Sequence, residues 1–305
     1  MAGLKAIKLK IRSIDKTRKV TQAMEAVSAA KMRKSQAAAL SGRAYARAAM
    51  STLSRVSGTA DMASHPLAKN RDVKKAMYIV ITSDKGLAGG LNSGVLRAAY
   101  ADVTSLGLQP KDVSIIAVGR KAFEFFTRRG YEVEAFHFNT ADTVSEGLMS
   151  EIMHESADRF AKGNTDLVRI AYQNFISTFE QRPTIRTIFP LSLTELAKVV
   201  ADITPAKGKF AEKTAEAPSA YTIEPSPEEV LSAILPKLAS IFVYHALLES
   251  HASEHSARMV AMKAASDKGE EMEHELTLEF NKARQAAITR EVSEITGGME
   301  AMTGK

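Results

Sequence analysis

Apolar residues near the amino end of the chain recur in steps of three and four positions. This stripe consists of Leu4, Ile7, Ile11, Ile14, Val20, Met24 and Val27. Such spacing puts side chains on one face of an α-helix. From Leu4 to Ser57 there is no Pro and the only Gly is Gly42. We therefore expect one helix over residues 1–57, far longer than an average globular helix.

The carboxyl end shows the same period over residues 227–296. Its apolar positions are Ile234, Leu238, Ile241, Leu248, Met259, Met262, Leu276, Phe280, Ala283, Ala287 and Ile288. Ser226 followed by Pro227 and two Glu residues is typical of a helix start. Pro236 predicts a kink or a start one turn later, and Gly297-Gly298 predicts the end.

A long helix with a narrow apolar stripe is not stable alone in water, because most helix stability comes from packing. The two terminal helices are each other's obvious partners. We predict a long antiparallel two-helix coiled coil, with the longer carboxyl-terminal helix projecting beyond the start of the other.

The middle of the chain, residues 74–200, alternates apolar runs with helical stretches. The expected strands are Ala76–Thr82, Val113–Val118, Tyr131–Phe138, Leu167–Phe175 and Thr187–Leu191. The expected helices are Ser93–Ser105, Lys121–Arg129 and Thr143–Lys162. This order predicts an inserted α/β domain with a parallel, Rossmann-like sheet. Residues 201–226 have no period and are expected to form a loop or linker.

Composition excludes several kinds of site and segment. The absence of Cys excludes disulfides and thiolate metal sites, and no uninterrupted apolar segment reaches the roughly 20 residues that span a bilayer. The basic, amphipathic amino end superficially suits a mitochondrial presequence. Because its pattern continues far past any cleavage site, we interpret it as mature structure.

Charge is distributed unevenly. Residues 1–57 carry thirteen Lys and Arg against Asp15 and Glu25, a net charge of +11, whereas the whole chain carries +6. The remainder is therefore acidic, at −5. A basic helix of this kind needs an acidic partner such as nucleic acid, anionic lipid or an acidic protein surface.

The stretch SDKGLAGGLN, Ser83–Asn92, stands between an expected strand and an expected helix. Its glycines, Gly86, Gly89 and Gly90, give G-x-x-G-G, which is neither the dinucleotide fingerprint nor the P-loop. The next strand ends at Gly119-Arg120, without an acidic residue for a ribose. We interpret the loop as a tight turn or a close-packing surface.

Two other patterns suggest chemistry without establishing it. His251-Ala-Ser-Glu254-His255 matches the H-x-x-E-H zinc motif, but it lies in the middle of a long helix, where a polar patch on the coiled coil is the simpler interpretation. The basic helix permits nucleic-acid binding, but only Tyr45 is available there for stacking. No nucleophile triad or catalytic carboxylate pair is visible in the sequence.

Three segments together resemble the gamma subunit of F-type ATP synthases, of the bacterial type. They are Ile14–Gln36, Ile81–Asn92, and the carboxyl-terminal ASEHSARMVAMKAASDKG with LEFNKARQAAITREVSEITGG. Ala88 stands where many relatives carry Cys, residues 202–224 are longer than expected, and no Cys-containing redox insertion is present.

The resemblance implies a rotor shaft that couples transmembrane proton flow to ATP synthesis on the alpha and beta subunits. It implies no catalytic residue, cofactor or metal in this chain. Its implied partners are alpha and beta, epsilon and the membrane c-ring, without nucleic acid. The implied location is the cytoplasmic face of the bacterial inner membrane, with the matrix side of the mitochondrial inner membrane as the alternative. A basic coiled-coil nucleic-acid binder and, more remotely, a zinc hydrolase are the rival functions.

By similarity, particular residues are expected to contact beta. Met24, Lys31 and Arg33, with Arg258 on the facing segment, would meet its acidic lever loop. Arg284, Gln285 and Thr289 would form an upper contact. The glycine loop is expected to pack at the base of the shaft.

Overall fold

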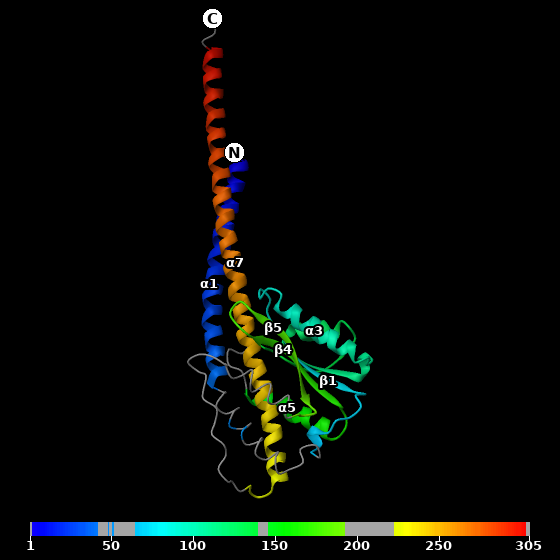
Figure 1. Ribbon diagram of the computed structural model, residues 1–305. Helices are drawn as coiled ribbons and strands as arrows, with labels where there is room; N and C mark the ends of the chain where they lie inside the picture. The colour runs from blue at the N-terminus through cyan, green and yellow to red at the C-terminus, as the bar shows by residue number, and fades with distance from the viewer. Residues whose placement is uncertain are drawn as a thin grey trace. The chain divides into compact units, whose positions relative to one another are not determined.

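The computed structural model describes residues 2–41, 48, 51, 65–139, 146–192 and 223–302. The chain divides into two compact units, Met1–Ala29 with Arg258–Lys305, and Ala30–Ala257. Two long helices contribute to both units: α1, Ala2–Ser41, and α7, Pro227–Met302 (Figure 1).

The smaller unit is an antiparallel pair formed by α1 and α7. Arg18 marks the register, because a Cβ added to Gly269 would lie 3.5 Å from the Arg18 Cβ. The Arg18 Nε also lies 3.2 Å from an oxygen of Glu273. Earlier in α1, Lys10 and Ile14 line a groove together with Leu276 and Glu279, which come later in α7. The two helices therefore run in opposite directions. The predicted antiparallel coiled coil is confirmed.

Both helices contribute covered or half-covered positions at alternating steps of three and four, the heptad spacing of a coiled coil. On α1 these positions are Leu4, Ile7, Ile11, Ile14, Arg18, Thr21, Glu25 and Ser28. On α7 they are Met262, Ser266, Gly269, Glu273, Leu276, Phe280, Ala283 and Ala287. After Ala287 every described side chain of α7 is exposed, and α7 extends beyond the start of α1 (Figure 1).

One part of the predicted stripe is wrong. Val20 and Val27 are 57% and 55% exposed, whereas Thr21 and Ser28 are 9% and 3% exposed. A heptad continued from Ile14 reaches residues 18, 21, 25 and 28, so the two valines face outward. Small and polar side chains therefore fill this part of the seam, where the helices approach closely at Gly269.

The ends of α7 agree only in part with the sequence. The Ser226 hydroxyl accepts a hydrogen bond from the Glu229 N–H at 3.2 Å, which confirms the predicted start. Pro236 lies inside the helix rather than delaying its start. The predicted stop at Gly297-Gly298 is wrong, because the helix continues to Met302.

The larger unit is built on a five-stranded sheet of order β3-β2-β1-β4-β5. Its strands are β1 Ala76–Ile81, β2 Val113–Val118, β3 Glu132–His137, β4 Leu167–Phe175 and β5 Gln181–Phe189. Parallel pairing joins β1 to β2 with Ile79 opposite Ile116, and β1 to β4 with Val80 opposite Ala171. The last strand departs from the prediction, because β5 begins earlier than expected and runs antiparallel to β4.

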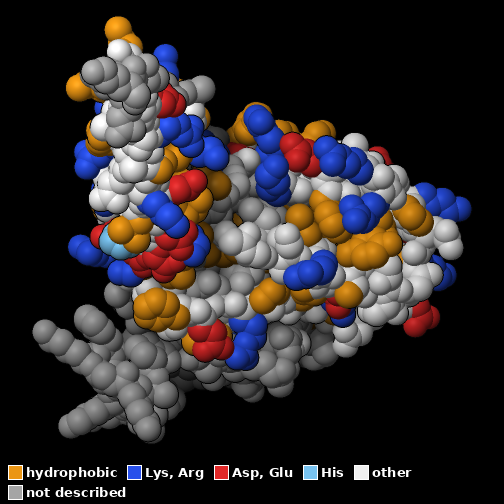
Figure 2. All heavy atoms as spheres, turned by 90° about the horizontal axis from the view of Figure 1, so that it is seen from above, with side chains coloured by type: hydrophobic (Ala, Val, Ile, Leu, Met, Phe, Trp, Pro, Cys, Tyr) orange, Lys and Arg blue, Asp and Glu red, His pale blue; other side chains and the backbone are white. Residues whose placement is uncertain are grey.

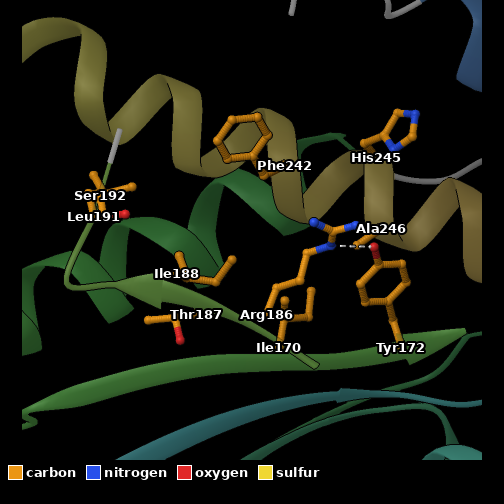
Figure 3. A pocket seen from close by; sticks show the side chains of 10 residues that line it. All are labelled: Ile170, Tyr172, Arg186, Thr187, Ile188, Leu191, Ser192, Phe242, His245 and Ala246. Carbon is orange, nitrogen blue, oxygen red and sulfur yellow. Dashed lines mark hydrogen bonds between the residues drawn. The ribbon is translucent and has the colours of Figure 1, made fainter. Parts of the chain in front are cut away.

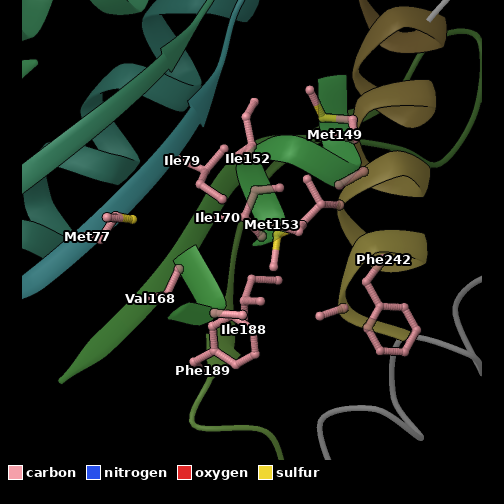
Figure 4. Close-up of a cluster of buried hydrophobic side chains, with 14 of the residues drawn as sticks. Met77, Ile79, Met149, Ile152, Met153, Val168, Ile170, Ile188, Phe189 and Phe242 are labelled. Carbon is pink, nitrogen blue, oxygen red and sulfur yellow. The ribbon is translucent and has the colours of Figure 1, made fainter. Parts of the chain in front are cut away.

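Each face of the sheet carries its own core. Against one face lie α3, Leu91–Ser105, and α4, Arg120–Thr127, which bury Val95 and Phe126. Against the other lie α5, Glu146–Ala161, and the first part of α7. Figure 4 shows this second core, where Met153 and Phe242 meet the strand residues Ile170 and Ile188. The observed helices confirm the predicted elements Ser93–Ser105, Lys121–Arg129 and Thr143–Lys162 to within a few residues. The expected loop 202–224 lies almost wholly outside the described residues.

Candidate functional site

The glycine-rich loop follows β1 at the carboxyl end of the parallel strands, where α/β sheets commonly bind ligands. Two of its residues have left-handed backbone angles, Leu87 with φ 63° and Gly89 with φ 57°. Gly86, Gly89 and Gly90 are all exposed. No described atom lies within 4 Å of a Cβ added at any of the three, so the described part of the chain leaves room there for a close approach.

Polar groups at the two ends of this loop bond to each other. The Ser83 N–H donates to the Asn92 side chain at 3.0 Å, and the Asn92 amide donates to the Ser83 hydroxyl at 2.7 Å. The Ser83 hydroxyl in turn donates to the Lys85 carbonyl at 2.6 Å. These hydrogen bonds join the two ends of the loop and fix its path.

Residues at the start of the loop also cap α4, the helix that follows β2. The first three N–H groups of α4 donate, in order, to the Asp84 carboxylate at 2.7 Å, the Ser83 carbonyl at 3.4 Å and the Thr82 hydroxyl at 2.9 Å. A helix start whose free donors are satisfied in this way does not offer them to an anion. The geometry therefore supports a structural loop.

Two residues outside the glycine-rich motif hold the strand end from which this loop starts. Gly119 has φ 105°, and a Cβ there would lie 2.0 Å from the Thr82 carbonyl oxygen. The Asn139 amide donates to the same oxygen at 2.8 Å. Asn139 is 57 residues from the strand end that it supports, so spacing alone does not single it out.

A small cavity between β4, β5 and α7 is lined mainly by apolar surface, with a few polar side chains (Figure 3). The Arg186 Nε donates to the Tyr172 hydroxyl at 2.9 Å, and the His245 Nδ1 lies 3.4 Å from an oxygen of Glu249. Burial raises the pKa of Tyr172, and the nearby Glu249 carboxylate raises it further. The space that water can reach is about 20 Å³, which suits a single water and is far below the several hundred Å³ of a typical ligand pocket.

The H-x-x-E-H pattern lies on a buried part of α7. His251 and Glu254 are 6% and 8% exposed, and the His251 and His255 rings are 6.3 Å apart between centroids. Two neighbouring serines bond to β4 and to the turn after it: Ser253 donates to the Gln173 carbonyl at 3.2 Å, and Ser256 to the Thr178 carbonyl at 2.6 Å. Among the described residues, no group of three His, Asp or Glu side chains is arranged to hold a metal ion. The motif serves packing.

The expected partner-contact residues differ in exposure. Arg33, Arg284, Gln285 and Thr289 are exposed, and Met24 and Lys31 are half-buried. Arg258 is only 8% exposed, so most of its surface already meets this chain. Met24 shares a face of α1 with the exposed Val20 and Val27, since the steps between them are four and three. Sequence reasoning had assigned those two valines to the seam, and their spacing with Met24 was the available signal.

Hydrophobic side chains are also exposed at the far end of α7. Ile288, Val292, Ile295 and Met299 are each more than half exposed, and they follow one another in steps of four, three and four. Figure 2 shows hydrophobic and basic side chains side by side on one face of the molecule. Surfaces of this composition are typical of contacts with other proteins.

One helix of the described chain, Pro227–Met299, is long and apolar enough to cross a membrane by length and composition alone. Half of its apolar window is buried inside the structure, as in the core helix of a globular unit. Leu235 and Leu238, both fully buried, contribute to the core shown in Figure 4.

Comparisons with known proteins agree over nearly the whole chain. The family model described as ATP synthase matches residues 3–302. The ATP synthase gamma chain of Heliobacterium modesticaldum is 40% identical over 303 residues, covering 99% of this chain and 100% of the relative. That of Cupriavidus pinatubonensis is 38% identical over 302 residues, with the same coverage.

Solved structures share the fold. A chain of the Euglena gracilis mitochondrial ATP synthase, in a structure of OSCP, F1 and c-ring, superposes with a TM-score of 0.65 at 18% identity, over 99% of this chain and 95% of that one. A chain from the central stalk and c-ring of the Tetrahymena thermophila enzyme gives 0.58 at 22% identity, over 81% and 99%.

Proposed function

This chain belongs to the ATP synthase gamma chain family, and from that premise we propose that it rotates as the shaft that couples proton flow to ATP synthesis. It is a non-catalytic component of the central stalk. The observation that carries the proposal is the antiparallel pair of α1 and α7, whose heptad seam runs from Leu4 to Ser28 and from Met262 to Ala287.

A shaft has to transmit torque without melting. Two helices wound together resist bending and unwinding better than one, because each covers the seam of the other. The seam here combines apolar contacts near Ile14 and Leu276 with the ion pair between Arg18 and Glu273. This combination fixes the register along the helix axis as well as the pairing.

A shaft also needs an outer surface that its neighbours can push against. Val20, Met24 and Val27 form an outward apolar stripe on α1 that is bordered by basic residues. We place the contact with the acidic lever loop of beta there, with Lys31 and Arg33 following on the same helix. Arg258 on α7 belongs to the same expected contact, although only 8% of it is exposed in this chain. Arg284, Gln285 and Thr289 form the upper contact.

The remaining partners follow from the same role. The alpha and beta subunits surround the helix pair, whereas epsilon and the c-ring turn with this chain. The loop of Gly86, Gly89 and Gly90 packs closely against one of these neighbours. The complex holds the chain at the cytoplasmic face of the bacterial inner membrane.

Single-molecule rotation tests the proposal directly. Since the chain has no Cys, a single Lys111→Cys substitution at an exposed site can carry a bead on a complex with purified alpha and beta. We expect ATP to drive stepwise rotation of the bead in one direction. A bead that stays still on an actively hydrolysing complex, or a purified chain that does not assemble with alpha and beta, would overturn the proposal.

The contact at Met24 is tested by Met24→Lys in membrane vesicles. Adding a cation to the apolar stripe should lower ATP synthesis several-fold relative to ATP hydrolysis, because the new charge binds the acidic loop too tightly for smooth turning. Gln22→Lys, on an exposed position of the same helix, is the matched control. Equal synthesis-to-hydrolysis ratios in both variants would argue against this placement.

A further inference from the structure

The last part of α7 within the larger unit, residues 250–256, is buried but mostly polar. Nearer its start, α7 meets the sheet through apolar core side chains, over residues 231–247. Along residues 250–256, by contrast, the side chains of Ser253 and Ser256 are fully buried. This segment also carries the H-x-x-E-H pattern. Buried polar groups need hydrogen-bond partners, so the contacts of α7 change here from apolar packing to hydrogen bonds.

Ser253 supplies a hydrogen bond that the strands cannot make. The pairing of β4 with β1 ends at Ala171, and Gln173 lies beyond it. In β5, the residue opposite Gln173 is Pro183, which has no N–H to donate. The Gln173 carbonyl accepts instead from the Ser253 hydroxyl at 3.2 Å. A helix side chain thus takes the place of a strand donor.

Ser256 lies three residues later on the same face of α7 and holds the turn that follows β4. Its hydroxyl donates to the Thr178 carbonyl at 2.6 Å. The Gln181 side-chain amide donates to the Ser177 carbonyl at 3.1 Å and to the Thr178 carbonyl at 3.0 Å. The same amide lies 3.5 Å from the Ser256 hydroxyl. The turn is therefore braced from within at the point where α7 binds it.

The serine clamp, which consists of Ser253 and Ser256, comes just before the division of the chain into two compact units. That division falls between Ala257 and Arg258, and α7 continues through it as one helix to Met302. Apolar packing has no preferred direction, whereas a hydrogen bond weakens steeply when it is bent. Two hydrogen bonds from one helix face therefore oppose rotation of α7 about its own axis against the sheet.

We propose that the serine clamp is the joint through which torque passes between the sheet of the larger unit and α7, with Ser253 and Ser256 as positioning residues. The inference rests on the proposed function, because only a rotating chain has torque to transmit. It gives the serines within and beside the H-x-x-E-H pattern a mechanical role. The property that the clamp sets is the torsional stiffness of the shaft.

The double variant Ser253→Ala/Ser256→Ala tests the joint in the complex with alpha and beta. A bead on Lys111→Cys, in the larger unit, reports the angular compliance between that unit and the helices that alpha and beta hold. We expect the bead's angular distribution during pauses between steps to be about 1.4-fold broader in the variant, because its variance is inversely proportional to stiffness and about half of the stiffness is lost. ATP hydrolysis without load should not change, since a softer joint slows only a rotor that works against a load.

The matched control is Ser156→Ala/Ser240→Ala, in the same unit. Both hydroxyls bond to carbonyls of their own helices, Ser156 to Ile152 at 2.7 Å and Ser240 to Pro236 at 3.0 Å. Their removal takes away as many hydroxyl groups but leaves the hydrogen bonds between α7 and the β4 region intact. The angular distribution of the control complex should therefore equal that of the unmodified complex.

Each outcome decides the question. An unchanged angular distribution in the complex with Ser253→Ala/Ser256→Ala overturns the proposal, and so does equal broadening in the control complex. Should the double variant fail to assemble, Ser256→Ala alone decides in the same way, with a smaller broadening expected. An unmodified complex that hydrolyses ATP without rotating would refute the proposed function instead, so the two failures are distinguishable.

Discussion

At the scale of single residues, Gly119 shows how one position can fix a strand-to-helix junction. Gly119 combines φ 105° with a backbone contact that leaves no room for a side chain, since the Thr82 carbonyl occupies the place of a Cβ. The Thr82 hydroxyl also accepts a hydrogen bond from the Ala122 N–H at 2.9 Å, which holds the residue after β1 against the start of α4. The junction between β2 and α4 therefore depends on a glycine outside the glycine-rich motif itself.

Gly119→Ala should lower the free energy of unfolding by about 3 kcal/mol, because it adds both backbone strain and a clash. Urea denaturation of the purified chain measures this loss. Gly130→Ala is the control: Gly130 has φ 77°, but no described atom lies within 4 Å of its added Cβ, so strain alone should cost about 1 kcal/mol. Equal losses at the two positions would contradict the steric explanation.

His65 gives the chain a residue-level response to pH. Its Nδ1 accepts from the Leu67 N–H at 3.2 Å, and its Nε2 lies 3.3 Å from the Ser232 hydroxyl. Burial lowers the pKa of His65 below its usual 6.5, so the folded chain favours the neutral ring. The stabilising contribution is complete above about pH 6.5 and is lost as the pH falls through the lower, folded-state pKa.

The free energy of unfolding should therefore fall more steeply between about pH 7 and about pH 5 in the unmodified chain than in His65→Asn. Asn retains an acceptor for the Leu67 N–H but does not titrate in this range. Parallel urea denaturation series at several pH values provide the measurement. Identical slopes for the two proteins would show that His65 does not carry this dependence.

At the scale of elements, sequence periodicity predicted most of the fold. Strands buried on both faces, such as β1 and β2, were found almost to the residue because their apolar runs are uninterrupted. The antiparallel β5 was shortened in the prediction, since its first half carries polar residues and Pro183. In the helix pair, the spacing of three and four allows two continuations after Ile14: the apolar residues from Val20 to Val27, or the positions from Arg18 to Ser28. Only contact with α7 decides which of the two is covered.

Gly269→Ala should stabilise the helix pair by up to about 0.8 kcal/mol, because Ala is the better helix former and its Cβ would stand 3.5 Å from Arg18, an ordinary contact. Thermal unfolding of the purified chain followed by circular dichroism detects this gain. Gly269→Leu, by contrast, should destabilise the pair, because its larger side chain would force the helices apart. A stabilising Leu would show that the close approach at Arg18 is not required.

At the scale of the whole molecule, function lies in surfaces rather than in a pocket. Sequence reasoning located the long helices and the glycine loop, and the resemblance supplied their role. It could not find that Phe123 of α4 stacks on Phe136 of β3, because only the folded sheet brings these two elements together. Nor could it foresee that Arg258 is buried, since burial depends on which face of α7 meets its neighbours.

A chain ending at Ile288 should unfold within about 2 °C of the full-length chain, because every described residue of α7 from 289 to 299 is exposed and adds no packing. Differential scanning calorimetry of both purified chains tests this expectation. A chain ending at Asp267, which lacks the α7 residues from Gly269 to Ala287 that cover α1, should lose stability clearly. A large loss of stability in the chain ending at Ile288 would reveal contacts that the exposure of the deleted segment does not suggest.

The bare end of α7 has a consequence for how the protein is made. Ile288, Val292 and Ile295 expose an apolar stripe with coiled-coil spacing, to which a second copy of the chain or a protease can bind. Chain synthesised in excess of its assembly partners is therefore prone to aggregation and proteolysis. Balanced synthesis of this chain and its partners avoids both.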